Sequence, residues 1–245
     1  MKIAITGNGN VAYHLIPALR QKNVRDAYEV VQITTNADSL VPDADIYLLL
    51  VPDGAIYELA ETLRLPNKII AHASGATPLK AISAVSSNVG VFYPVQTFSK
   101  DAELINFENV PICIEASNEK TEKVLANLAR LLSRSVHKIN SENRAKIHLA
   151  CTFANNFTNA LYSISEKILQ EIPQADISLL LPIIEQTARK IKTVKPIKAQ
   201  TGAAMRNDTV TIEKHLQILQ SEPHLKNVPQ LQELYRLFTE IIRNR

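Results

Sequence analysis

The sequence predicts a doubly wound, parallel α/β domain followed by an all-helical domain. In the first half of the chain, short runs of β-branched or apolar residues alternate with helical patterns. The run 46–51 is apolar on both faces, which is typical of a strand in a sheet that helices cover on both sides. After about Asn140 the strand signals stop, and only helical patterns follow. We therefore expect domains at 1–140 and 141–245, with Ser141 as the N-cap of the first helix after the boundary.

The expected elements follow from the spacing of apolar residues along the chain. The expected strands are 2–6, 29–34, 46–51, 68–72, 90–93, 111–115 and 135–139. The expected helices are 11–21, 55–63 and 119–133 in the first domain, and 142–171, 175–194, 209–220 and 231–243 in the second. Continuous apolar strands separated by helices predict a parallel sheet with helices on both faces.

Composition narrows the class of protein. With 46% hydrophobic and 21% charged residues, the chain has the balance of a soluble globular protein. The net charge of +3 suits an anionic ligand, but no basic stripe interleaved with aromatic residues favours nucleic acid. The apolar runs are too short to span a membrane, and the N-terminus enters a strand without a signal core. We expect a cytoplasmic protein with no metal site, since the six His are scattered and the two Cys lie in apolar stretches.

The first expected strand leads into a glycine turn that has the G-x-G-x-x-A pattern. The turn comprises Gly7, Asn8, Gly9, Asn10, Val11 and Ala12. Gly7 permits the tight turn, Gly9 lets the backbone approach a pyrophosphate, and the small Ala12 lets helix and strand pack closely. The pyrophosphate would then lie at the positive end of a helix. This pattern predicts binding of a nicotinamide dinucleotide; the alternative is an ordinary turn in a domain that has lost its ligand.

The end of the second expected strand bears on which nicotinamide cofactor is bound. An acidic residue there would hydrogen-bond a ribose 2′-hydroxyl, whereas small polar residues tolerate a 2′-phosphate. The sequence has Thr34, Thr35 and Asn36 at this position, with no acid at the strand end itself. NADP is therefore favoured. NAD is the alternative, with Asp38 as the ribose ligand if the strand runs longer.

The turn after the third expected strand lies at the same edge of the sheet. It comprises Val51, Pro52 and Asp53. Pro52 stops the strand, and Asp53 can cap the helix that follows. We expect this turn to pack against the cofactor as well.

Polar side chains follow the fourth and fifth expected strands. His72 and Ser74 come after the fourth strand, and Gln96 and Thr97 come after the fifth. At this edge His72 could exchange a proton during hydride transfer, while Ser74 and Gln96 would hold the substrate. The alternative is that Ser74 and its neighbours only shape a turn, with His72 hydrogen-bonded in place.

The long helix expected after the boundary carries a polar stripe on a mostly apolar circumference. At 100° per residue the stripe comprises Arg144, His148, Thr152, Asn155 and Asn159, with Asn156 just beyond it. A helix that is apolar around most of its girth is buried, so its polar stripe is expected to face a cleft. The alternative is a solvated face. Lys146 points to the opposite side.

These positions give a set of candidate site residues. His148 and His72 are the candidate acid and base, and Asn155 and Asn156 act with them on the substrate. Ser74, Gln96, Thr152 and Arg206 are the candidate substrate-binding residues. Arg206 lies in the loop before the helix 209–220 and could bind an anionic group, although it could instead pair with Asp208 to hold the loop.

Together these segments resemble bacterial proteins described as NADP oxidoreductases, in which a Rossmann-like domain precedes a helical domain of unknown function (DUF2520). That family is distantly similar to pyrroline-5-carboxylate reductase and to the 6-phosphogluconate and β-hydroxyacid dehydrogenases. The matching segments cover nearly the whole chain: the glycine turn, 51–53, 72–75, 93–98, 148–156 and 201–208. The resemblance implies a helical domain like the C-terminal domain of 6-phosphogluconate dehydrogenase and a homodimer built by the helical domains.

The sequence also departs from these families. Ala203 stands where the family pattern Thr-Gly-Pro-Ala-x-Arg has its proline. The catalytic lysine of β-hydroxyacid dehydrogenases has an asparagine four residues later, but Lys146 is followed at that distance by Ala150. The lysine mechanism is therefore not transferred, and the resemblance supplies no substrate.

We expect an NADP-dependent oxidoreductase that acts on a small polar substrate between the sheet edge and the helical domain. The rival hypothesis is a dinucleotide-binding redox sensor or regulatory module without turnover. Only an enzyme needs an acid or base beside the nicotinamide ring. The apolar residues in 177–184 and 231–242 exceed what one small helical layer can bury, which independently predicts a homodimer through the helical half.

Overall fold

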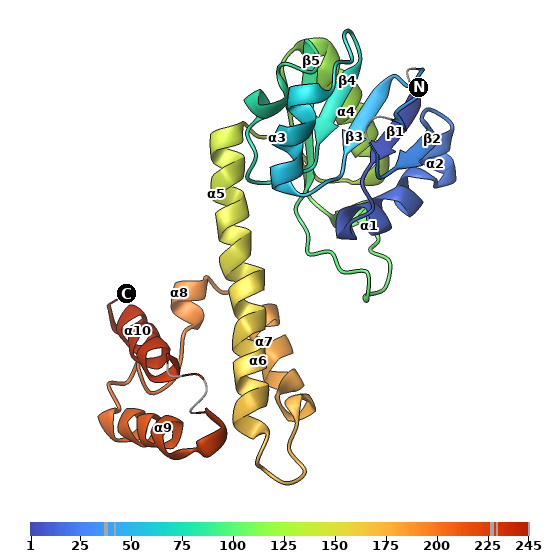
Figure 1. Cartoon of the computed structure of the whole chain (residues 1–245). Helices are drawn as coiled ribbons and strands as arrows, with labels where there is room; N and C mark the ends of the chain where they lie inside the picture. Colours follow the sequence, from blue (N-terminus) through green and yellow to red (C-terminus); the bar gives the residue numbers. More distant parts are fainter. Residues whose placement is uncertain (37–38, 42, 226–227, 229, 245) are drawn as a thin grey trace. The chain divides into compact units, whose positions relative to one another are not determined.

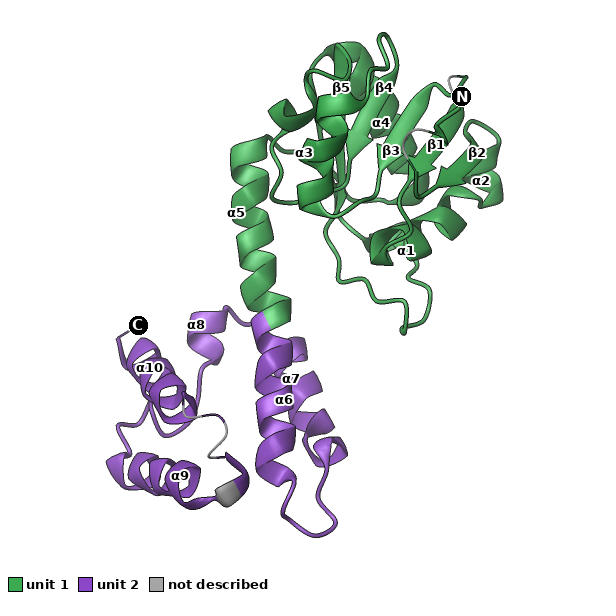
Figure 2. Ribbon diagram, viewed as in Figure 1, with its two compact units in different colours: residues 1–156 green, residues 157–245 purple. Residues whose placement is uncertain are grey.

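The computed structural model of the chain describes residues 1–36, 39–41, 43–225, 228 and 230–244, and it divides into two compact units (Figure 1). Unit 1 spans residues 1–156 and unit 2 spans residues 157–245, as coloured in Figure 2. No helix in the described part of the chain is both long enough and apolar enough to cross a membrane.

Within the described part of unit 1, seven strands form one sheet in the order β2-β1-β3-β4-β5-β6-β7. The strands are β1 (Lys2–Thr6), β2 (Glu29–Thr34), β3 (Ile46–Leu49), β4 (Ile69–His72), β5 (Asn88–Pro94), β6 (Ile112–Ala116) and β7 (Val136–Lys138). All neighbouring strands are parallel except β5 and β6, which pair antiparallel. The predicted α/β fold with a Rossmann-type sheet is confirmed, with this one pair reversed.

The reversed pair has a physical cause in the connection between β5 and β6. A parallel connection needs a crossover, usually through a helix that packs on the sheet. Residues 95–111 instead form a loop whose described secondary structure is the short 3₁₀ turn η3 (Phe107–Asn109). Without a crossover helix the chain returns alongside β5 in the opposite direction. The register therefore places Gly90 beside Ala116 and Pro94 beside Ile112.

Helices cover both faces of the sheet, as a doubly wound fold requires. The covering elements are α1 (Asn10–Leu19), α2 (Lys22–Arg25) and α4 (Glu119–Leu132) on one face, and α3 (Asp53–Thr62) with the 3₁₀ turn η2 (Leu79–Ile82) on the other. Successive strand residues alternate between the two cores. Leu48 packs in the cluster that contains Leu15 of α1, whereas Leu49 packs in the cluster that contains Ile56 of α3. Both faces of β3 are buried, which explains its continuous apolar run.

The strands end at Lys138, and the helix α5 (Ser141–Cys151) begins at the predicted composition boundary. The N-cap of α5 is Asn140 rather than the predicted Ser141, because the Asn140 side chain accepts a hydrogen bond from the Asn143 N–H at 2.9 Å. The helical path continues through the π-helical segment η4 (Thr152–Phe157) into α6 (Thr158–Leu169). Compact unit 1 extends to Asn156 and therefore includes α5.

Unit 2 is helical throughout its described elements. Besides α6 they are η5 (Ile177–Leu180), α7 (Leu181–Lys190), α8 (Pro196–Ala199), α9 (Thr209–Ser221), η6 (Pro223–Leu225) and α10 (Leu231–Arg243). Among its described apolar side chains, only Ile212, Leu225 and Leu231 are buried. By contrast, Leu179 and Ile183 are 66% and 65% exposed. Unit 2 therefore has a small core and a large apolar surface.

A buried arginine fastens α5 to the sheet. The side chain of Arg144 has no exposed surface, and its Nη1 donates to the Glu115 carboxylate of β6 in a close ion pair. Its Nη2 donates to the Thr77 carbonyl oxygen at 2.6 Å, just before η2. The Ser141 hydroxyl donates to the same Glu115 carboxylate at 2.7 Å. Arg144 therefore lies inside unit 1, and the prediction that it belongs to a stripe facing a cleft was wrong.

This arrangement predicts that Arg144→Met destabilises the protein by about 3–5 kcal/mol, because it leaves the Glu115 carboxylate partly buried without its cation. The matched control is Lys146→Met on the same helix, which removes an exposed pair with Glu142 and should change stability little. Urea unfolding followed by circular dichroism measures both. Equal losses from the two variants would show that the buried pair does not hold α5.

Candidate functional site

The sheet has a topological switch point between β1 and β3. From β1 the chain continues to β2, which pairs with one edge of β1. It then crosses to β3, which pairs with the other edge of β1. In open α/β sheets, ligands bind in the crevice that such a switch creates at the carboxyl ends of the strands. The glycine turn follows β1 at this crevice, and residues 50–53 follow β3. The two predicted cofactor-binding turns are thus neighbours.

The glycine turn has the geometry that a phosphate site needs. Gly7 has φ +118°, and a Cβ added there would lie 2.0 Å from the Leu50 carbonyl oxygen, so no other residue fits. A Cβ added at Gly9 would meet no described atom within 4 Å. Gly9 is the N-cap of α1, and in the described structure no side chain caps this helix and no acid lies in its first turn. The positive end of α1 is therefore open to an anion.

Two adjoining cavities, of about 360 and 450 Å³, open at this edge within unit 1. Both are lined by Asn10, Val11, Tyr93, Gln96, Phe98 and His148. The first adds mainly residues of the two turns and of the loop after β4: Gly9, Leu50, Val51, Pro52, Asp53, Ala73, Ser74, Gly75 and Pro94. The second adds Val95, Thr97, Cys151, Ala154, Asn155 and Asn156. A cavity of about 630 Å³ lies elsewhere, between α1 and α4.

His148 reaches these cavities from α5, one helical turn after the buried Arg144. Its Nδ1 lies 3.2 Å from the Tyr93 hydroxyl. Burial, with the neighbouring Cys151 thiol, raises the pKa of Tyr93, so this hydroxyl keeps its proton. A protonated hydroxyl can donate to a ring nitrogen or accept from a ring N–H, and either hydrogen bond orients the His148 ring. The imidazole is therefore held in place at the cavity wall.

Gly75 permits the close approach of His148 and Tyr93 to the loop after β4. A Cβ added at Gly75 would lie 2.6 Å from the His148 Nδ1 and 2.8 Å from the Tyr93 Cζ. Any larger residue would have to displace one of the two rings. The sequence predicts at most a turn-shaping role for Gly75, because a contact with a helix that begins far along the chain leaves no local signal.

The π-helical segment η4 brings further predicted residues to the second cavity. A π turn contains more residues than an α turn, so side chains after it are rotated around the helix axis. The predicted residues Asn155 and Asn156 line the cavity together with His148 and with Cys151 at the end of α5, which was not predicted. Thr152 lines neither of the two cavities, and its hydroxyl donates to the His148 carbonyl oxygen at 3.2 Å. Its predicted substrate-binding role receives no support from this geometry.

His72 is separated from the cavities. Its side chain is fully buried and lines neither of them, and its Nδ1 accepts a hydrogen bond from the Ser74 N–H at 3.2 Å. Burial, with the nearby Arg144 charge, lowers the pKa of His72 to about 3, so the ring is neutral at physiological pH. Ser74 lines the first cavity, but its hydroxyl donates to the Thr77 hydroxyl and accepts the Thr77 N–H, both at 2.9 Å. The observed contacts match the turn-shaping alternative.

The predicted residues at the end of β2 form a local turn. The Thr34 hydroxyl accepts a hydrogen bond from the Asn36 N–H at 3.0 Å and lies 2.9 Å from the Ser39 hydroxyl. Thr35 is exposed beside them. Asp38, the alternative ribose ligand, lies outside the described residues.

Two further predicted residues flank the cavities. Asp53 lies in the first turn of α3, where a negative charge is favourable, but the N-cap is Pro52 and not Asp53 as predicted. Its carboxylate makes no capping hydrogen bond in the described structure. The Gln96 Oε1 accepts the Thr97 N–H at 2.8 Å, which leaves its amide N–H groups for a ligand.

Arg206 belongs to unit 2. Its side chain is exposed in the turn before α9, whose N-cap Asp208 accepts a hydrogen bond from the Thr211 N–H at 3.0 Å. The role of Arg206 in substrate binding stays a prediction.

Comparisons with known proteins agree with this architecture. The family model of DUF2520, a domain of unknown function, matches residues 110–242. The structure of "putative NADP oxidoreductase BF3122" from Bacteroides fragilis is 31% identical, with a TM-score of 0.85 over 100% of this chain and 98% of that one. No curated protein sequence matches the chain.

More distant structures share the fold. Protein TM1727 from Thermotoga maritima is 20% identical, with a TM-score of 0.72 over 97% of this chain and 99% of that one. The reductive aminase from Aspergillus terreus, in complex with NADPH and ethyl-5-oxohexanoate, is 12% identical, with a TM-score of 0.68 over 99% of this chain and 94% of that one. The family match covers more than half of the chain, and the Bacteroides structure matches it along its whole length. The chain therefore belongs to the DUF2520 family, in the oxidoreductase-like form that joins a Rossmann-type sheet to a helical region.

Proposed function

We propose that the protein is an NADP-dependent oxidoreductase that acts on a small polar substrate. One observation carries the proposal: the open glycine turn and the His148 imidazole line the same cavity at the topological switch point. A dinucleotide site and a group able to exchange a proton are the two things that hydride chemistry on a carbonyl, imine or hydroxyl requires of a protein. The name of the Bacteroides relative supports the same class of activity.

Residues of two turns are suited to hold the dinucleotide. The glycine turn and the positive end of α1 would bind the pyrophosphate, and Val51 and Pro52 would pack against the rest of the cofactor. The open space at Gly9 fits this role, because a backbone without a side chain lets a phosphate come close. When bound, the nicotinamide ring would supply or accept the hydride.

The preference for NADP rests on the residues that follow β2. Thr34, Thr35 and Asn36 bring hydroxyl and amide groups, and none of these three positions is acidic. A ribose 2′-phosphate is tolerated by such a set, whereas a carboxylate would repel it. The reductive aminase that shares this fold was solved with NADPH, which supports the same choice.

His148 is the proposed acid or base. Histidine is the side chain that most often serves as a general acid or base in proteins, and this one lines both cavities. Tyr93 would orient the ring, and the amides of Gln96, Asn155 and Asn156 would hydrogen-bond the substrate. His72 is not assigned the second acid or base role that the sequence suggested, since its ring is buried away from the cavities.

Gly9→Val should abolish NADPH binding while leaving the fold intact, because the side chain would fill the space that a pyrophosphate needs without meeting protein atoms. Titration of NADPH fluorescence measures affinity, and circular dichroism checks the fold. The unaltered protein should bind NADPH more tightly than NADH. A tenfold advantage for NADH would contradict the assignment of NADP, and unchanged NADPH affinity in Gly9→Val would show that this turn is not a phosphate site.

His148→Ala should leave NADPH affinity nearly unchanged and lower turnover by about 10²–10⁴, the usual contribution of a positioned acid or base. A panel of small ketones, imines and alcohols, screened by NADPH absorbance, first identifies a substrate. Lys146→Ala, whose side chain is exposed two residues earlier, is the matched control and should do little. If no compound in the panel is turned over although NADPH binds, the redox-sensor hypothesis gains over the enzyme.

We also propose a homodimer that forms through unit 2. Its small core and the exposure of Leu179, Ile183 and Val210 support this proposal, since an apolar surface of this kind is costly to leave in water. The family resemblance of the sequence implies the same assembly.

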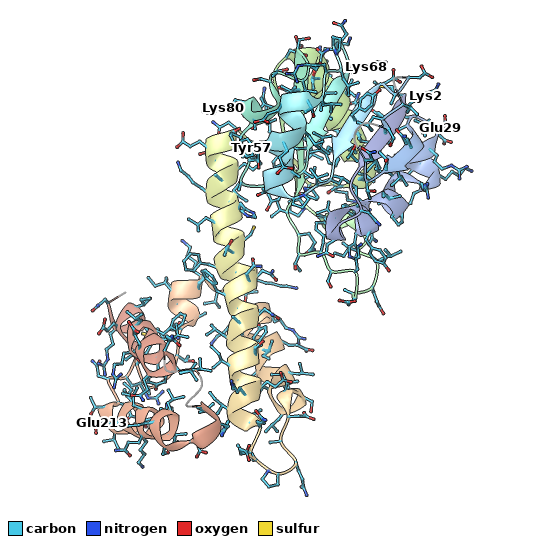
Figure 3. All side chains as sticks on the ribbon, in the orientation of Figure 1. Lys2, Glu29, Tyr57, Lys68, Lys80 and Glu213 are labelled. Carbon is cyan, nitrogen blue, oxygen red and sulfur yellow. The ribbon has the colours of Figure 1, made fainter. Side chains whose placement is uncertain are left out.

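Light scattering at micromolar concentration should therefore give twice the chain mass of 27.2 kDa. Ile183→Glu should shift the protein toward the monomer, because the charge would be buried in the interface. Tyr57→Glu, at a half-exposed apolar position on α3 of unit 1 (Figure 3), is the control and should leave the dimer intact. A monomer at every concentration tested would refute the dimer.

A further inference from the structure

The loop 95–111 forms one wall of the candidate site, although it has little secondary structure of its own. Gln96 and Phe98 line both cavities, and Thr97 lines the second. The next residues, 99–106, are mostly exposed. A loop of this kind stays in one conformation only if contacts from outside hold it.

His14 of α1 supplies such contacts with both of its ring nitrogens. Its side chain is only 1% exposed. The Nε2 lies 2.8 Å from the Ser99 carbonyl oxygen, and the Nδ1 accepts a hydrogen bond from the Ile105 N–H at 3.2 Å. A carbonyl oxygen can only accept and a backbone N–H can only donate, so His14 carries its single proton on Nε2. One neutral imidazole thus joins two points of the loop that are six residues apart in sequence.

The contact extends to the cavity wall through aromatic rings. The His14 ring centroid lies 5.4 Å from that of Phe98, and the Phe98 ring stacks on Phe107 at 6.0 Å with an angle of 22° between the planes. Phe98 immediately precedes the residue whose carbonyl oxygen His14 binds. The position of the Phe98 ring in the cavities therefore depends on where His14 holds the chain.

The same helix carries the first residues of the candidate cofactor site. Asn10 lines both cavities and lies four residues, or about one helical turn, before His14. The N-terminus of α1 therefore lines the candidate cofactor site, and His14, one turn later, binds the loop that forms the opposite wall. One helix thus contacts both walls, which fixes the distance between them.

We propose that His14 is a positioning residue that holds the wall formed by Gln96, Thr97 and Phe98 against the glycine turn, and so sets the affinity for the dinucleotide. The proposal rests on the proposed function for its ligand, but the clamp itself is a property of unit 1 alone. Neither nitrogen of His14 is left to touch a substrate, so its effect is indirect, through the loop.

The test compares two replacements of His14. Phenylalanine keeps a ring of similar volume but forms neither hydrogen bond, whereas glutamine has one donor and one acceptor and can restore both. His137→Phe, an exposed histidine on β7, is the control. Endoproteinase Glu-C cuts after Glu103, which is exposed between the two anchored residues. NADPH affinity is measured on the same proteins by fluorescence.

We expect Glu-C to cut after Glu103 about tenfold faster or more in His14→Phe, since two hydrogen bonds hold this segment. We also expect NADPH affinity to fall several-fold, with both properties restored in His14→Gln and unchanged in His137→Phe. Cleavage rates equal to those of the unaltered protein would overturn the clamp. Equal acceleration at glutamates throughout unit 1 would show general destabilisation and would overturn it too.

The measurement of NADPH affinity distinguishes failure of this inference from failure of the proposed function on which it rests. Faster cleavage with unchanged NADPH affinity would refute the coupling between loop and dinucleotide site. If the unaltered protein binds neither NADPH nor NADH, the proposed function fails, and the cleavage rates still decide whether His14 clamps the loop.

Discussion

The position of the α5 helix is governed by the solvation of one guanidinium group. A cation taken out of water is tolerated only where fixed acceptors replace its hydration shell, and Arg144 has the Glu115 carboxylate and the Thr77 carbonyl oxygen in that place. Those acceptors come from β6 and from the loop before η2, so satisfying them fixes α5 in both rotation and height. His148 lies one helical turn further along α5, so the contacts of Arg144 also fix the position of His148. Its contact with Tyr93 and Gly75 follows from a charge that takes no part in chemistry.

Much of unit 1 could be predicted from local sequence pattern. The seven strands and the glycine turn depend on short-range periodicity and on the steric freedom of Gly7, both of which are visible in the sequence. The antiparallel return of β6 was not predicted, because an apolar strand looks the same in either direction. The partner of Arg144 was not predicted either. A helical projection gives the face on which a polar residue lies, but not whether that face meets a cavity or a carboxylate on a strand 29 residues away.

His72 and His148 show that local sequence pattern also gives only part of the site. His72 ends β4 at the correct edge of the sheet, yet its ring lies in the interior, where it accepts a hydrogen bond from the Ser74 N–H. At the end of a strand, the pleat and the following turn decide whether a side chain faces a ligand or the core. His148 was identified from its unusual company, a mostly apolar helix whose polar stripe has amides instead of lysine and glutamate. The expectation that this helix is buried was wrong, because Leu149 and Phe153 are 58% and 63% exposed. Composition around a residue was more informative here than its position relative to a strand.

The surroundings of the two cysteines differ in a way that has a practical consequence. Cys113 is buried in β6, whereas Cys151 is only partly covered and lines the second cavity beside His148. Alkylating reagents discriminate between thiols by access to the sulfur. Alkylation of Cys151 therefore reports whether the second cavity is occupied, because a molecule bound beside His148 would shield the Cys151 thiol from iodoacetamide. Mass spectrometry of the alkylated peptide would register such occupancy for any compound, coloured or not, without an engineered label.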